Sequence, residues 1–119
     1  MTLPDELKQA AQALGQSLRA ADEVQTYLDA QARLAADPEA SSLEDQASNL
    51  YQQLATRQRA GEELTETEVN EYYALRSLVQ SHPLVAGRDL ALNQLKSYLA
   101  QVGQDLSLEL GMDYTALAR

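Results

Sequence analysis

Apolar residues recur every three or four positions along almost the whole chain, the spacing of helices that bury one face. Nowhere does the alternation of a half-buried strand extend over a comparable length. The pattern predicts an all-α fold, a bundle of about five amphipathic helices with a central antiparallel helical hairpin and a long C-terminal helix. The expected helices cover about residues 3–20, 22–37, 38–60, 65–79 and 83–110.

Two prolines mark helix starts. Pro38 and Pro83 each fit a first helical turn, where the missing backbone N–H has no intrahelical partner. Asp37 stands directly before the first proline, and Ser81 or His82 stands before the second, where an N-cap acceptor belongs. The chain is therefore expected to turn sharply at both places.

The hairpin is predicted from a stop and a start that lie close together. Gly61 suits the left-handed residue that ends many helices. Thr65, followed three residues later by Glu68, forms a capping-box pattern that opens the next helix. The short loop of residues 61–64 between them favours two antiparallel helices.

The first two helices have weaker start signals. Thr2, with Pro4 and Asp5 in the first turn, is expected to open the first helix. Asp22 and Gln25 have the spacing of a capping box at the start of the second. Whether the two form one continuous helix stays open.

The last helix carries the most regular apolar stripe. Its apolar positions repeat at three, four, three and four residues, the heptad spacing of packed helices. At 1.5 Å per residue the helix would be roughly 42 Å long, which is longer than one short neighbouring helix can cover. The stripe and the tyrosine beside it are therefore predicted to form an interface in a homo-oligomer or a hetero-oligomer: Leu92, Leu95, Tyr98, Leu99, Val102 and Leu106.

Chain length suits one domain, residues 1–119, in which Gly111 ends the last helix and residues 112–119 form a short flexible tail. No stretch has the length and apolar character of a membrane span, and the first residues lack the pattern of a signal peptide. We therefore expect a cytoplasmic protein with no membrane partner.

Acidic residues dominate, with a formal net charge of −9. They concentrate between residues 37 and 71, where only Arg57 and Arg59 oppose them. Such a surface repels phosphate, so direct nucleic-acid binding is not expected. The acids could simply solvate a helix face, or they could form a docking patch for a basic partner. The candidates for that patch are Glu62, Glu63, Glu66 and Glu71.

Residues that commonly carry catalysis or bind metals are scarce. The chain has no cysteine and one histidine, His82, which fits a cap better than a Ser-His-Asp arrangement. Glu68 and Glu71 share a helix side at a spacing of three and could bind a metal, yet they also fit acids favoured in a first helical turn. We predict no enzyme and no catalytic, cofactor-binding or metal-binding residue.

Tyrosines adjoin most of the apolar stripes. A stacking platform for bases is one interpretation of this pattern, and packing in a core or an interface is the one we favour. The tyrosines concerned are Tyr27, Tyr51, Tyr72 and Tyr98.

Taken together, these landmarks resemble the YlbF/YmcA family of small all-helical bacterial regulators. The resemblance covers residues 3–110 and rests on the order and spacing of these landmarks: Tyr27, Ala30, Leu34, Asp37-Pro38-Glu39, Leu43, Leu50, Gly61 and His82-Pro83-Leu84-Val85. Members often have an aromatic residue where this chain has Ala47. The iron–sulfur clusters of the family's best-known assembly are held by cysteines, which this chain lacks, so no cluster is expected.

The resemblance implies a cytoplasmic protein that associates with itself or with paralogous subunits. Family members regulate competence, biofilm formation and sporulation, and act with ribonuclease Y in RNA processing, which makes a ribonuclease a further expected partner. We therefore predict a non-enzymatic regulatory or adaptor protein that works through protein–protein interaction between helices. The alternative is a small helical metal-binding protein or enzyme that uses the acidic hairpin.

Overall fold

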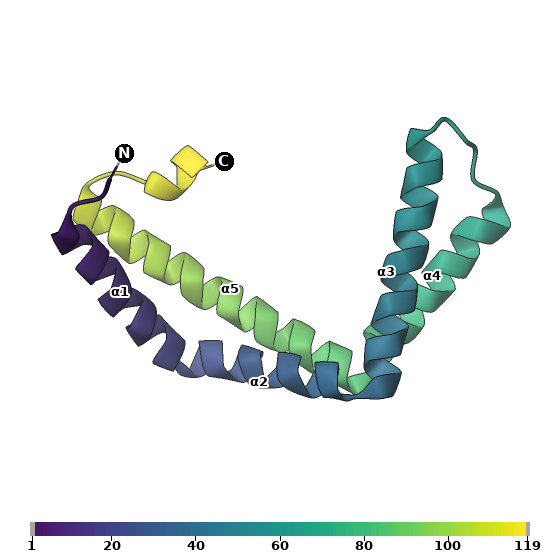
Figure 1. Ribbon diagram of the computed structural model, residues 1–119, viewed down its shortest axis with the longest axis horizontal. Coiled ribbons are helices and arrows are strands. Elements are labelled where there is room, and N and C mark those ends of the chain that lie inside the picture. Colours follow the sequence, from purple (N-terminus) through teal and green to yellow (C-terminus); the bar gives the residue numbers. More distant parts are fainter. Residues whose placement is uncertain (1, 119) are drawn as a thin grey trace. The chain divides into compact units, whose positions relative to one another are not determined.

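The computed structural model describes residues 2–118, which form α-helices and one short 3₁₀ helix (Figure 1). No strand occurs in this part of the chain, so the predicted all-α class is confirmed. The helices in chain order are α1 (Asp5–Ala20), α2 (Asp22–Ala36), α3 (Pro38–Arg59), α4 (Glu66–Ser81), α5 (Pro83–Leu110) and the 3₁₀ helix η1 (Tyr114–Ala118).

The chain divides into two compact units. Unit 1 holds the residues up to Asp29 together with those from Leu90 onward, and unit 2 holds Ala30–Asp89. Unit 1 thus contains α1, the first half of α2, most of α5 and η1. Unit 2 contains the end of α2, all of α3 and α4, and the first turns of α5.

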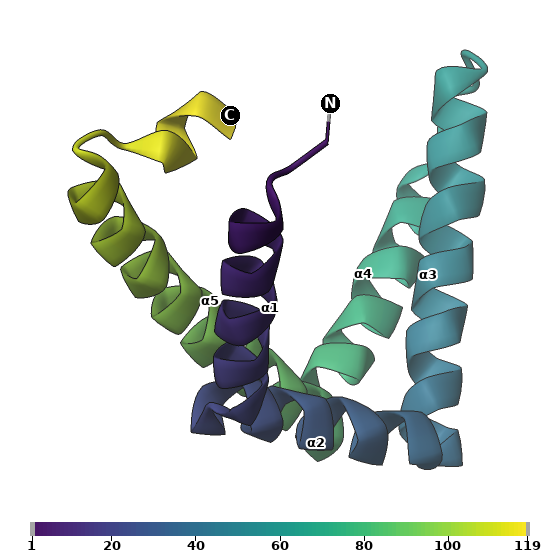
Figure 2. The same ribbon diagram turned by 60° about the vertical axis from the view of Figure 1, so that its left-hand side comes forward.

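In unit 2, α3 and α4 lie side by side in both views and pack on each other more extensively than any other pair of described helices (Figure 2). Asp37 caps α3 by accepting hydrogen bonds from the backbone N–H groups of Glu39 and Ala40, at 2.9 and 3.1 Å. Gly61 has φ +87°, the left-handed conformation expected after α3. Thr65 and Glu68 form the predicted capping box at the start of α4.

The core of unit 2 lies where four helices meet. Its buried residues each come from a different helix: Leu34 from α2, Ala40 from α3, Val79 from α4 and Val85 from α5. Leu43, Ala47 and Leu84 pack around them. Because Ala40 and Ala47 have only a methyl side chain, α3 can approach its neighbours closely here.

The predicted start of the first helix is wrong in detail, and for the second helix the start at Asp22 is confirmed but the predicted capping box is wrong. Helix α1 begins at Asp5, with Pro4 as its N-cap, and the preceding residues are not helical. Asp22 is the first residue of α2 and does not form a capping box with Gln25. The Gln25 side chain instead donates to the Arg19 carbonyl at the end of α1. An extended residue, Ala21 with ψ 142°, separates the two helices, so they are not continuous.

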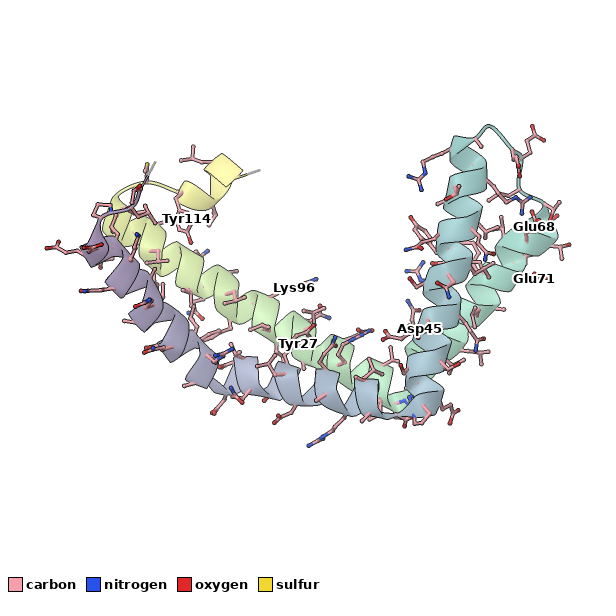
Figure 3. All side chains as sticks on the ribbon, viewed as in Figure 1. Tyr27, Asp45, Glu68, Glu71, Lys96 and Tyr114 are labelled. Carbon is pink, nitrogen blue, oxygen red and sulfur yellow. The ribbon has the colours of Figure 1, made fainter. Side chains whose placement is uncertain are left out.

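In unit 1, η1 packs on α5 at Gly103. A Cβ atom placed on Gly103 would lie 3.2 Å from Thr115 Cγ2 and 3.6 Å from the Tyr114 hydroxyl. Tyr114 accordingly lies between η1 and α5 (Figure 3). The tail that we predicted to be flexible therefore contains a helical turn, and its flexibility stays a prediction. Over residues 2–118, no helix is both long enough and apolar enough to span a membrane.

Candidate functional site

The predicted apolar stripe of α5 lies in unit 1 and is incompletely covered. Leu99 is 43% exposed and Leu106 37% exposed. The remaining members of the stripe are half-buried: Leu92, Leu95, Tyr98 and Val102. None of the six is buried, so the stripe still has apolar surface to offer to another helix.

Helix α1 adds to this uncovered apolar surface. It has no buried residue, although Leu7 and Leu14 occupy its apolar stripe. Leu7 is 55% exposed and Leu14 is 38% exposed. A helix with an apolar stripe is normally stabilised by packing that stripe against a neighbour. Helix α1 therefore lacks most of the burial that would stabilise it.

The uncovered stripes of α1 and α5 both belong to unit 1. They provide apolar surface that another subunit could cover.

The acidic patch lies at the end of the α3–α4 pair. Its four candidates, Glu62, Glu63, Glu66 and Glu71, are all exposed. Of these, only Glu62 forms an ion pair with a described residue. The other three carboxylates keep their charge available at the surface.

Arg57 organises this end of the pair, a role that the sequence did not reveal. Its Nε donates to Glu62 at 2.7 Å, and its two terminal nitrogens donate to the carboxylate of Glu68 at 2.7 and 3.3 Å. These hydrogen bonds to Glu68 and Glu62 raise the pKa of Arg57. The bond from Arg57, followed by that from the Thr65 backbone, lowers the pKa of Glu68. The loop is thus tied to both helices.

A cluster of tyrosines lies beside the acidic patch. The ring centroids of Tyr51 and Tyr72 are 5.8 Å apart, and those of Tyr72 and Tyr73 are 5.7 Å apart. Tyr51 and Tyr73 are each 57% exposed. The apolar stripes predict packing for Tyr51 and Tyr72, and the sequence pattern does not indicate that Tyr73 joins them in a cluster.

Two of the residues that could bind a metal or take part in catalysis, Glu68 and His82, have structural partners. Glu68 is bound to Arg57 and the Thr65 backbone, whereas Glu71 lies one turn further along α4 (Figure 3). His82 Nδ1 accepts a hydrogen bond from the Leu84 backbone N–H at 3.2 Å, which is the predicted cap role. No group of three metal-binding side chains occurs among residues 2–118.

Residues 7–110 match the family described as "Control of competence regulator ComK, YlbF/YmcA". The chain belongs to the YlbF/YmcA family. The predicted resemblance is thereby confirmed, and the chain is a member of a family of regulators. A comparison with curated proteins gave no match.

Among solved structures, the chain is similar to Bacillus subtilis RicA, which was crystallised in complex with RicF. The TM-score is 0.75 and the sequence identity is 21%, with 98% of this chain and 100% of RicA covered. At this identity the similarity establishes a shared fold. The two chains therefore share their fold over nearly the whole length of this chain.

Proposed function

We propose that this protein is a non-enzymatic regulatory subunit, a single helical domain that acts in the cytoplasm by pairing with a second helical subunit. The observation that carries the proposal is the uncovered apolar surface of unit 1, on α1 and α5. Burying such surface is the main favourable contribution to association between proteins. The function of the subunit is then to bind a partner protein rather than to catalyse a reaction.

The second subunit is either another copy of this chain or a paralogue of the same family. The heptad stripe from Leu92 to Leu106 suits both, since helices of similar sequence present matching ridges and grooves. The complex of the structural neighbour RicA with RicF supports pairing with a second, different subunit. The paired subunits would then form one assembly that regulates competence, biofilm formation or sporulation.

The acidic patch would then remain available for the protein that is regulated. Its unpaired carboxylates favour a basic surface on that partner, and we include a ribonuclease among the candidates. Contact with RNA would pass through such a partner, because the patch itself repels phosphate. The metal-binding alternative is less well supported, since Glu68 is already bound by Arg57.

Light scattering tests the pairing directly. The chain is measured alone and after co-expression with each paralogue from its own genome, and an assembly larger than a monomer is expected in at least one case. Leu99→Asp should dissociate that assembly because it places a charge in the stripe. Leu90→Asp is the matched control, since Leu90 lies on the same helix, is 61% exposed and is outside the stripe.

A monomer in every mixture would contradict the proposal. Equal dissociation by Leu99→Asp and Leu90→Asp would also contradict it, because the stripe would then have no special part in assembly. Circular dichroism of each variant shows whether the helices remain folded. If Leu99→Asp unfolds a monomer without first dissociating an assembly, the stripe packs within the chain.

A further inference from the structure

The segment that follows α5 folds back onto that helix, within unit 1. Gly111 ends α5 with φ +74°, a left-handed conformation, and the next backbone N–H, of Met112, donates to the Ser107 carbonyl at 3.1 Å. The Thr115 hydroxyl then donates to the Asp113 carboxylate at 2.6 Å, which closes a turn at the start of η1. We call residues 112–118 the strap.

The strap contacts α5 at Gly103, which has no side chain to hold it away. A Cβ atom at Gly103 would lie 3.2 Å from Thr115 Cγ2 and 3.6 Å from the Tyr114 hydroxyl. Gly103 is buried, whereas neither of its neighbours in the sequence is, and Tyr114 is half-buried. The strap therefore covers this position of α5.

The strap is nevertheless packed loosely. A cavity of about 870 Å³, open to solvent, lies between the last turns of α5 and the strap. Met112 is 55% exposed and Leu117 is 75% exposed, so the strap buries little of its own apolar surface. The Ser107 hydroxyl is buried and has no hydrogen-bond partner among the described residues, which costs free energy. Few contacts would be lost if the strap moved away.

The position that the strap covers borders the stripe that we propose for pairing. Leu99 lies four residues before Gly103 and Leu106 lies three residues after it, so both are its neighbours on the helix surface. Leu99 and Leu106 are also the most exposed members of the stripe. The axes of two packed helices are only about 8–10 Å apart. A partner helix lying on Leu99 and Leu106 would therefore meet the residues of the strap that contact Gly103.

We propose that the strap is an autoinhibitory segment, which must leave Gly103 before a second subunit can cover the stripe. The proposal rests on the proposed function and adds a regulation of the same surface. When a segment of the chain and a partner exclude each other, the apparent affinity falls with the fraction of molecules that are free to bind. A strap that covers Gly103 in about 80–90% of molecules would weaken pairing roughly five- to tenfold. Its loose packing suits this role, because a partner can displace it.

A disulfide tests the strap in the full chain. The chain has no cysteine, so a pair of introduced thiols has no competitor. Gly103→Cys with Thr115→Cys is the locking variant, because Thr115 Cγ2, one bond from Cβ, lies 3.2 Å from the Cβ position of Gly103. Disulfides join Cβ atoms that are about 3.5–4.5 Å apart. Oxidation in dilute protein should form the bond within one chain, as a non-reducing gel shows.

Association of the locking variant is then measured by light scattering in its oxidised and reduced forms. The probe is a second copy of the chain over a series of concentrations, or the paralogue that pairs with it in the co-expression test. The oxidised form should associate at least ~10-fold more weakly than the reduced form, because no molecule can release its strap. The reduced form carries the same substitutions and is the matched control.

Gly111→Ala tests the opposite change. Alanine is strained at φ +74°, so the turn that brings the strap back to α5 is weakened, while nothing lies within 4 Å of the new Cβ atom. We expect this variant to pair several-fold more tightly than the unaltered chain. Gly61→Ala is the control, since Gly61 has φ +87° and equally open surroundings but lies in the loop of unit 2. Circular dichroism checks that both variants stay helical.

Three outcomes would overturn the proposal and leave the pairing intact. Equal association of the oxidised and reduced forms would show that the strap does not oppose the partner. Weaker pairing of Gly111→Ala than of the unaltered chain would place the strap in the interface itself. Failure of the two cysteines to join within one chain would show that the strap does not rest on Gly103. A monomer in every form, the reduced form and Gly111→Ala included, would instead contradict the pairing, and the strap proposal with it.

Discussion

The guanidinium of Arg88 in α5 binds the carboxylate of Glu44 in α3, although the two residues are forty-four positions apart in the sequence. Two parallel hydrogen bonds join them, from Nη1 to Oε1 at 3.1 Å and from Nη2 to Oε2 at 2.6 Å. The side chains are only 17% and 29% exposed. Burial by itself would lower the pKa of Arg88, but the hydrogen bonds to Glu44 and Asp89 outweigh it and raise the pKa. The pair thus fixes the first turns of α5 against α3.

Removing the Glu44 carboxylate should destabilise unit 2. Glu44→Gln keeps the side-chain shape and leaves the Arg88 charge partly buried without its main partner. A loss of about 1–3 kcal/mol is expected, as for other partly buried groups that lose a charged hydrogen bond. Urea unfolding measures it, with Asp45→Asn, an exposed acid on the next position of α3, as the control. Equal losses from the two variants would show that only net charge matters.

Acid should weaken the start of α4 through Glu68. Its pKa is lowered in the folded chain, first by Arg57 and then by the Thr65 backbone. A group with a lowered pKa stabilises the fold above its unfolded pKa, here 4.5, and this contribution disappears as the pH falls further. Glu68→Gln should therefore reduce the difference in stability between pH 6 and pH 3. An unchanged difference would contradict the ion pair with Arg57.

Glu66→Gln supplies the control for this pH dependence. Glu66 occupies the same first turn of α4 but is exposed and has no ion pair with a described residue. We expect it to alter the pH dependence less than Glu68→Gln does. Hydrogen exchange of the backbone amides in the first turn of α4 locates the effect.

Replacing leucines of α3 and α4 by alanine should lower the free energy of unfolding by amounts that follow the burial of each leucine. The sequence predicts that Leu50 and Leu54 both face the core, and the structure leaves Leu54 8% exposed and Leu50 half-buried. Leu54→Ala should cost about 2–5 kcal/mol, and Leu50→Ala less. Leu78→Ala, at a site that is 60% exposed, should change the free energy of unfolding by less than about 0.5 kcal/mol. A loss below that level at Leu54 would contradict its place in the core.

The sequence predicted the helices of unit 2 well because their ends are specified locally. Asp37 before Pro38, Gly61, and the pair Thr65 and Glu68 each satisfy backbone groups within a few residues of themselves. Such signals depend on no distant partner. The structure places all of them in the predicted roles.

Contacts between distant residues could not be predicted in the same way. Nothing in the local pattern pairs Arg88 with Glu44 or directs Arg57 towards both Glu62 and Glu68. Gln25 has a cap-like spacing from Asp22, yet it binds the end of the preceding helix because Ala21 is extended. The tyrosine cluster likewise depends on how α3 meets α4, which periodicity alone does not specify.

Replacing each of two glycines of α5 by alanine should change the stability of the protein differently. Gly87 has no atom near a new Cβ, so Gly87→Ala should stabilise the helix by about 1 kcal/mol. At Gly103 the new Cβ would lie 3.2 Å from Thr115 Cγ2, and the resulting crowding opposes the same gain. Thermal unfolding of the two variants measures the difference. Equal stabilisation would show that η1 does not hold its position on α5.

The isolated chain should not bind RNA tightly, whatever its partner does. Attraction to phosphate supplies most non-specific affinity for nucleic acid, and here the net charge of −9 makes that contribution repulsive. Anisotropy with a labelled single-stranded RNA at ~150 mM salt is expected to show no saturable binding. A double variant, Glu66→Lys with Glu71→Lys, distinguishes non-specific attraction to phosphate from specific recognition of RNA. The double variant should gain weak affinity that disappears as salt is raised, because added phosphate contacts release counterions. Tight, salt-resistant binding by the unaltered chain would instead require an RNA site on the protein itself.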